Sequence, residues 1–194
     1  MAHLFKKGRF KTLYVGLDES NCNTYRGEEV IVAVFSYDPN DSKDQRITNS
    51  KSHRSHISLD SLLGHADRSY LFALWKNGKE LNPKPSHLVR AAPFLVSEYL
   101  KKEKLSHHRE IESLVLHIDG KLDPDSKLFL EEKLKASLQI PFEIYEYPKG
   151  NRKKIIYPRI VQIADVLSHD LYCLSCGNKK DEIIERPQFV SYFT

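Results

Sequence analysis

Residues 13–21 read LYVGLDESN, an apolar run that stops at two adjacent acids, Asp18 and Glu19, before turn-forming residues. The run has the pattern of a buried β-strand. Its acidic end has two interpretations. Acids often follow a strand where it leaves the core for solvent, but a carboxylate at the carboxyl end of a strand is also well placed to hold a divalent cation. The other predicted elements of the chain are needed to decide between a solvated strand end and a metal site.

The size and composition of the chain are those of an ordinary soluble protein. At 194 residues it is predicted to be one domain, 1–194, long enough to bury a core without disulfides. Its 40% hydrophobic and 29% charged residues indicate a globular fold, and no apolar run is long enough for a signal peptide or a membrane span. Its 3 cysteines are too few for a disulfide framework, which favours a reducing, cytoplasmic compartment. A net charge of +4 permits a polyanionic partner without requiring one.

Hydrophobic periodicity predicts both strands and helices. Apolar runs with strand character lie at 11–18, 29–37, 69–75, 111–118 and 141–147. Segments with helical spacing lie at 87–104, with Ser86 as N-cap and a kink at Pro93, and at 124–138 and 157–176. The polar stretch 38–58 is predicted to be a long loop. The first three strands are close enough for an antiparallel meander, and the helices before the last two predict parallel crossovers, so we expect a mixed five-stranded α/β sheet with helices on its faces.

Two of the predicted strands end on an acid. The first ends at Asp18 and the fourth at Asp119, although the following Gly120 also makes a plain turn signal. If these strands are parallel neighbours, both carboxylates lie at the carboxyl edge of the sheet, where sites in such folds occur. Carboxylates this close repel each other unless a cation lies between them, and hard oxygen ligands suit Mg²⁺ or Mn²⁺. Two such ions would clamp the attacking and leaving oxygens of a phosphodiester.

The last predicted helix offers two candidates for a third acid. Asp165 lies well off the centre of the buried stripe, so it is either solvated or reaches the sheet edge from the helix flank. Asp170, five residues further on, is the alternative. Helical spacing by itself does not decide between them.

The element order and the positions of these acids resemble the ribonuclease H-like superfamily. The pair Asp18-Glu19 is similar to the Asp-Glu of type-2 ribonuclease H, and Asp119-Gly120 is similar to the Asp-Gly on the fourth strand of that family. Small, uncharacterised proteins of the same fold open with an Asp-Glu-Ser motif and carry a Gln-x-Ala-Asp helix near the C-terminus. The second motif matches Gln162, Ala164 and Asp165. The resemblance extends over 11–176 and rests on short motifs that occur in the same order on the same elements.

This resemblance implies a ribonuclease H-like fold with strand order 3-2-1-4-5 and helices on both faces. It implies that the catalytic metal ligands, for Mg²⁺ or Mn²⁺, are Asp18, Glu19, Asp119 and Asp165, and that an activated water hydrolyses a phosphodiester. Neighbouring strand residues point to opposite faces, so Glu19 joins Asp18 only through a local bend. Type-2 ribonuclease H follows its Asp-Glu with a Gly-Arg-Gly that reads the ribonucleotide, whereas this chain has Asn-Cys-Asn at 21–23. Activity on RNA–DNA hybrids is therefore not implied.

Basic clusters offer candidate contacts to a nucleic acid. They lie at 6–9, 51–56 and 152–154. The third cluster, Arg152, Lys153 and Lys154, immediately precedes the helix that carries Asp165 and could hold a phosphate backbone beside a metal site. Solvated surface is the simpler interpretation of each cluster taken singly.

Two further patterns are less specific. Tyr25 and Tyr157 are candidates for stacking on bases, although core or surface roles suit them equally. Cys173 and Cys176, with His169 nearby, have the spacing of half a zinc site, but thiols incidental to a helix end are the simpler interpretation.

Three functional hypotheses follow from these patterns. The first is a cytoplasmic, divalent-metal-dependent nuclease, a hydrolase whose partner is RNA or DNA. The second is a nucleic-acid-binding or interaction module of the same fold without catalysis. A phosphotransferase or ATPase ranks last, because no glycine-rich phosphate loop follows the first or second predicted strand.

Overall fold

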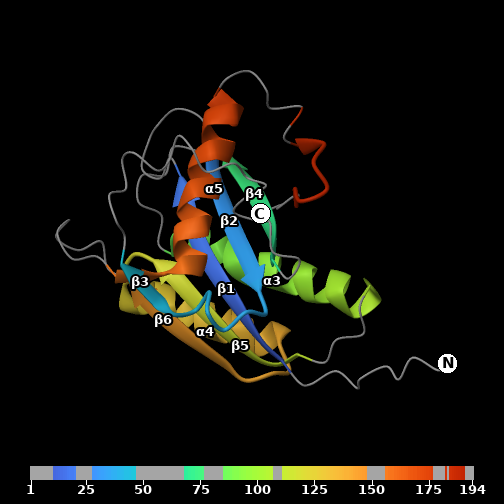
Figure 1. The fold of residues 1–194 in the computed structure, drawn as a ribbon, viewed down its shortest axis with the longest axis vertical. Helices are drawn as coiled ribbons and strands as arrows, with labels where there is room; N and C mark the ends of the chain where they lie inside the picture. Colours follow the sequence, from blue (N-terminus) through green and yellow to red (C-terminus); the bar gives the residue numbers. More distant parts are fainter. Residues whose placement is uncertain are drawn as a thin grey trace.

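A mixed five-stranded sheet forms the centre of the molecule, in the order β4-β2-β1-β5-β6 (Figure 1). The computed structural model describes residues 11–20, 28–46, 68–76, 85–106, 111–147, 156–176, 182 and 184–190. The strands of the sheet are β1 (Lys11–Ser20), β2 (Glu28–Ser36), β4 (Arg68–Lys76), β5 (Ile111–Asp119) and β6 (Phe142–Tyr147). β2 runs antiparallel to β1 and β4, whereas β1, β5 and β6 are parallel. In chain order this is 3-2-1-4-5, so the predicted ribonuclease H-like sheet is confirmed.

Helices cover both faces of the sheet (Figure 1). One face carries α3 (His87–Ser106) and α4 (Pro124–Ser137), and the other carries α5 (Arg159–Cys176). Successive strand residues point to opposite faces, which divides the core in two. Leu17 of β1 packs on the α3 and α4 side, whereas Val32 of β2 packs under α5. In the described part of the chain, no helix combines the length and apolarity needed to cross a bilayer.

The starts of two helices follow local sequence signals. The Asp123 carboxylate accepts a hydrogen bond from the backbone N–H of Ser126 at 3.0 Å, which caps α4, and Pro124 occupies the first turn, where its missing N–H has no consequence. The Ser86 hydroxyl accepts a hydrogen bond from the Val89 N–H at 3.4 Å at the start of α3. The predicted helix at 87–104 therefore forms, and it continues through Pro93 to Ser106.

A second, two-stranded sheet was not predicted. It pairs β3 (Asp44–Arg46) antiparallel with β7 (Ile156–Pro158). The sequence predicted a loop at 38–58, which was wrong at Asp44–Arg46, where β3 forms. The helix predicted from about residue 157 does form, but it begins at Arg159 because β7 occupies the preceding residues. The sequence did contain a signal that the helix begins after residue 157. Tyr157 precedes Pro158, and helical backbone angles are disfavoured for a residue that precedes proline.

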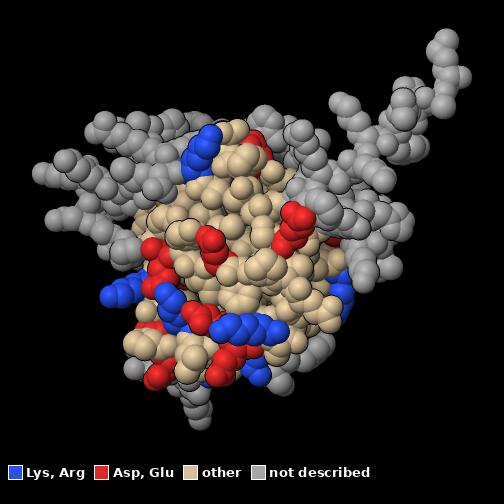
Figure 2. All heavy atoms as spheres, turned by 90° about the horizontal axis from the view of Figure 1, so that it is seen from below, with Lys and Arg blue, Asp and Glu red and all other residues tan. Residues whose placement is uncertain are grey.

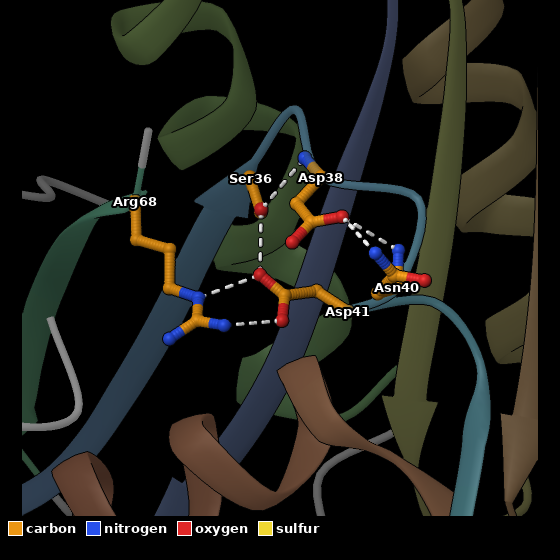
Figure 3. A network of polar contacts seen from close by, with 5 residues as sticks. All are labelled: Ser36, Asp38, Asn40, Asp41 and Arg68. Carbon is orange, nitrogen blue, oxygen red and sulfur yellow. Dashed lines mark hydrogen bonds and ion pairs between the residues drawn. The ribbon is translucent and has the colours of Figure 1, made fainter. Parts of the chain in front are cut away.

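A buried polar network fixes the loop between β2 and β3 (Figure 3). The Asp41 carboxylate accepts hydrogen bonds from Ser36 Oγ at 2.7 Å and from Arg68 Nε at 2.6 Å. Burial by itself would raise the pKa of Asp41, but the bonds from Arg68 and Ser36 lower it below its usual range. The Asp41 backbone carbonyl also accepts from the N–H of Ile160 at 2.9 Å. The network therefore ties the first turn of α5 to the sheet.

A segment near the C-terminus lies along the outer edge of β4. Phe189 forms a parallel bridge with Phe72, whose N–H donates to the Gln188 carbonyl at 3.1 Å. The Val190 N–H donates to the Phe72 carbonyl at 2.9 Å. These bonds pair backbone N–H and carbonyl groups of an edge strand that would otherwise be open to pairing with another chain.

Candidate functional site

The pairing register of the two central parallel strands brings two acids to the same edge. Leu17 of β1 is paired with Ile118 of β5, and the next residue on each strand is Asp18 and Asp119, respectively. Leu17 and Ile118 both belong to the core beneath α3 and α4. Because side chains alternate along a strand, Asp18 and Asp119 point to the other face, which α5 covers.

Helix α5 approaches β1 closely because Gly16 has no side chain. A Cβ atom at Gly16 would lie 2.4 Å from the backbone oxygen of Ile160, far inside van der Waals contact. Two turns further along α5, Ser168 Oγ donates a hydrogen bond of 2.7 Å to Asp18 Oδ2. Asp165 lies three residues before Ser168, and residues three apart share one flank of a helix. The close approach of the helix therefore brings a third carboxylate toward the sheet edge.

Electrostatics show that the charges of Asp119 and Asp165 act on Asp18. Asp18 is only 3% exposed, and its pKa is raised from 3.8 to about 7, chiefly by burial. The hydrogen bond from Ser168 lowers this pKa, whereas the negative charges of Asp119 and Asp165 raise it. These three acids, which we call the carboxylate cluster, come from β1, β5 and α5.

Tyr157 of β7 belongs to the same group of side chains. Its hydroxyl makes a side-chain hydrogen bond with the Asp119 carboxylate. Burial first, then the charge of Asp119 and that hydrogen bond, raise the pKa of Tyr157 to about 12, and the charges of Asp165 and Asp18 add to the rise. The sequence indicated Tyr157 as a possible base-stacking residue, and the structure instead places its hydroxyl on a carboxylate of the cluster.

Ser168 was missed from the sequence. A single serine in a helix carries no signal of its own, but its spacing of three residues from Asp165 would have singled it out once Asp165 was known to face the sheet. Its hydroxyl oxygen also lies 3.1 Å from the Asp165 carbonyl, so its one hydrogen lies between the helix and the strand.

The two alternatives for the acid on α5 lie on different sides of the helix. Asp165 is the acid whose charge acts on both Asp18 and Tyr157. At 3.6 residues per turn, Asp170 lies roughly 160° around the helix from Ser168, which faces Asp18. The arrangement around Asp18 therefore favours Asp165 over Asp170.

The Glu19 side chain lies on the other face of the sheet from the carboxylate cluster. It is paired with Ile31 of β2, and Ile31 packs on the α3 and α4 side of the sheet. The Glu19 side chain therefore leaves β1 on the opposite face from Asp18, while its backbone N–H makes a hydrogen bond to the Asp18 carboxylate. Its role as a metal ligand stays a prediction.

The chemistry of the cluster fits a hard divalent cation. Asp119 Oδ1 and Glu19 Oε2 are buried atoms that no hydrogen bond reaches, although both residues have other interactions. A cation among the three acids would offset both the burial of Asp18 and the repulsion that raises its pKa. Among the residues that the structure describes, no three His, Cys, Asp or Glu side chains are already arranged to hold an ion. Binding would therefore require these side chains to rotate.

The remaining candidate residues are outside the cluster or outside the described residues. The basic clusters at 6–9, 51–56 and 152–154, and Tyr25, all lie where the structure gives no description. On the face shown in Figure 2, the described Lys and Arg side chains are intermingled with Asp and Glu rather than gathered into one basic patch. Cys173 Sγ lies 3.6 Å from His169 Nε2 on the exposed side of α5, and the Cys176 side chain is not described.

Several solved structures are similar to this chain, each at low sequence identity. No protein-family model matches the chain, and no curated protein sequence matches it. The ribonuclease HII of Archaeoglobus fulgidus, solved in complex with PCNA, is 13% identical with a TM-score of 0.45, and the match covers 92% of this chain and 82% of that one. Ribonuclease H2 of Pyrococcus horikoshii OT3 is 18% identical with a TM-score of 0.44, over 92% and 81% of the two chains. Bst-RNase HIII in complex with Mn²⁺ is 16% identical with a TM-score of 0.44, over 88% of this chain and 54% of that one. The assignment of a ribonuclease H-like fold rests on the strand order and on the helices that cover both faces of the sheet, and not on these similarities.

Proposed function

We propose that this protein is a divalent-metal-dependent nuclease that hydrolyses phosphodiester bonds at the carboxylate cluster. The observation that carries the proposal is the convergence of Asp18, Asp119 and Asp165 from three separate elements, with the pKa of Asp18 raised to about 7. A fold that served structure alone would have little reason to bury a carboxylate beside two others, because that arrangement destabilises the charged form.

Each side chain of the cluster has a distinct part in this proposal. Asp18, Asp119 and Asp165 would hold Mg²⁺ or Mn²⁺, which supplies Lewis acidity and lowers the pKa of a bound water. Ser168, through its 2.7 Å bond to Oδ2, orients the Asp18 carboxylate. Tyr157 does the same for Asp119 through its hydroxyl. With these two donors in place, the remaining oxygen atoms of both carboxylates can turn toward a cation.

The burial of Asp18 also determines the pH range in which the site can bind a cation. Since the pKa of Asp18 is about 7, a large share of the protein carries a proton on Asp18 at neutral pH. A cation has to displace that proton, so its affinity should rise as the pH rises through 7. Nucleic acid is the partner that this chemistry serves, and Arg152, Lys153 and Lys154 remain candidate phosphate contacts.

Mn²⁺ binding tests the proposal most directly. Isothermal titration of the wild type should show saturable binding above pH 7, and Asp18→Asn and Asp119→Asn should each abolish it. Asp170→Asn is the matched control, because it removes one charge from the same helix on another side. If the wild type and the two cluster variants bind Mn²⁺ equally weakly, the metal site does not exist.

Cleavage assays complete the test. Single-stranded and double-stranded RNA and DNA, and an RNA–DNA hybrid, should be incubated with Mn²⁺, with Mg²⁺ and with EDTA. We expect metal-dependent cleavage of at least one substrate, lost in Asp18→Asn. Salt-dependent nucleic-acid binding without cleavage of any of them would instead support a binding module that kept the fold and lost catalysis.

A further inference from the structure

A hollow of about 540 Å³ lies beside the carboxylate cluster, over β5 and β6. Its lining, which we call the aromatic hollow, includes Tyr14, Val115, His117, Glu143, Tyr145 and Tyr147. His117 precedes Asp119 by two residues on β5, so both side chains project from the same face of the sheet. At about 3.3 Å per residue, their positions on the strand are only about 7 Å apart.

The rings of the aromatic hollow form a continuous series that leads to the cluster. Tyr145 is 47% exposed, and its ring lies 5.6 Å from the His117 ring with only 18° between their planes. The His117 ring lies 5.7 Å from that of Tyr147, which lies 5.8 Å from that of Tyr157. Tyr157 is hydrogen-bonded to Asp119. A flat ligand on Tyr145 would therefore sit at the solvent end of a series whose other end is the candidate metal site.

These rings are held in place before any ligand binds. His117 makes a hydrogen bond through each ring nitrogen, with Ser42 Oγ at 2.8 Å and with the Tyr147 hydroxyl at 3.0 Å. The Tyr145 hydroxyl donates to Glu143 Oε2 at 2.6 Å, which fixes the orientation of an exposed ring. An exposed aromatic face that is already oriented loses little conformational entropy when a planar ligand stacks on it.

The charges around the aromatic hollow indicate which part of a nucleotide it suits. Its carboxylates are those of Glu143 and Glu146, of which Glu146 is paired with Lys127 at 2.8 Å. Carboxylates repel phosphate but accept hydrogen bonds from the amino and imino groups of bases. A base within a duplex is stacked and paired, so only an unpaired base can present its face to Tyr145.

We propose that the aromatic hollow binds an unpaired nucleobase next to the phosphate held at the carboxylate cluster, and so selects single-stranded nucleic acid. The proposal rests on the nuclease function above and adds its substrate class. Stacking on Tyr145 contributes most of the affinity, and the nearby carboxylates exclude phosphate from the aromatic hollow.

Binding in EDTA tests the aromatic hollow independently of the metal site. Fluorescence anisotropy should be measured with short single-stranded RNA and DNA of mixed sequence and with the corresponding duplexes. The wild type should bind the single strands more tightly than the duplexes. Tyr145→Ala should weaken single-strand binding by roughly 5- to 100-fold, the usual range for loss of one stacked base, whereas Tyr145→Phe should stay within a few-fold of wild type because it keeps the ring.

Leu128→Ala is the matched control, since Leu128 is a 56% exposed apolar side chain on α4 that does not line the aromatic hollow. It should leave binding unchanged. Circular dichroism of each variant excludes misfolding. The proposal is overturned if duplexes bind as tightly as single strands, or if Tyr145→Ala binds like wild type.

The outcomes also separate this proposal from the nuclease proposal. Loss of single-strand binding in Tyr145→Ala, with Mn²⁺ binding that Asp18→Asn does not alter, would support base binding and refute the metal site. The reverse pattern, with Mn²⁺ binding dependent on Asp18 and single-strand binding independent of Tyr145, would keep the nuclease and refute the aromatic hollow as a base site.

Discussion

Replacing Asp18 by Asn should stabilise the protein at about pH 8 when divalent cations are removed. The wild-type carboxylate must ionise while buried beside Asp119 and Asp165, and the rise of its pKa from 3.8 to about 7 measures the free energy involved. This rise is about three pKa units, and at about 1.4 kcal/mol per unit it corresponds to about 4 kcal/mol of stability lost by the wild type. Asparagine carries no charge, and its side-chain oxygen can still accept the hydrogen bond from Ser168.

The pH dependence identifies the cause of this gain. A group whose pKa is raised by folding contributes stability that is fully present below its unfolded pKa, here 3.8, and that is lost as the pH rises through the folded value of about 7. The advantage of Asp18→Asn should therefore fall to less than half at about pH 5, where the folded wild type is already protonated. Urea unfolding of both proteins in EDTA at the two pH values measures the difference.

Two results would refute this reasoning. One is an Asp18→Asn variant that is less stable than wild type at about pH 8, and the other is a gain of equal size at both pH values. Adding Mn²⁺ supplies a further check, because a ligand at a hundred times its Kd stabilises by about 2.7 kcal/mol. Mn²⁺ should stabilise wild type and Asp170→Asn but not Asp18→Asn.

Three other perturbations test how the site is supported. Gly16→Ala places a Cβ atom 2.4 Å from a backbone oxygen of α5, so it should lower the free energy of unfolding by about 1–3 kcal/mol or more and weaken Mn²⁺ binding; unchanged unfolding in urea would contradict that contact. Ser168→Ala removes a bond that lowers the pKa of Asp18, so the pH midpoint of Mn²⁺ binding should move upward, and an unchanged midpoint in titrations across pH would count against the bond. Arg68→Met removes the guanidinium that is hydrogen-bonded to the buried Asp41 carboxylate and should lower the free energy of unfolding by about 3–5 kcal/mol. Adding Asp41→Asn to that variant should recover part of the loss in the same urea assay.

Much of the sheet could be predicted because its signals are local. Continuous β-branched and aromatic runs indicated strands such as β2, and the helices before β5 and β6 indicated their parallel direction. Pro124 similarly indicated the start of α4. The pairing of β3 with β7 could not be predicted, because strands of three residues are too short to show a period and their partners lie far apart in the chain.

The residues of the candidate site likewise include some that the sequence could predict and some that it could not. The ends of β1 and β5 already placed Asp18 and Asp119 at one edge, since strand direction and order follow from the order of elements. Asp165 could not be chosen over Asp170 from helical spacing, because the choice depends on how α5 is rotated against the sheet. Gly16 allows α5 to lie close to β1, and no pattern of residues within α5 indicates this contact.

The sequence by itself determined most of the elements, the directions of the main strands and the acids at the ends of two of them, since these depend on periodicity within short segments and on the order of those segments. Only the tertiary structure decided that Asp165 faces Asp18, that Ser168 and Tyr157 orient the carboxylates, and that an aromatic hollow lies beside them. The physical reason is that these contacts join residues far apart in the chain. They arise from the packing of a helix and a small second sheet on the strands, which no local pattern of residues specifies.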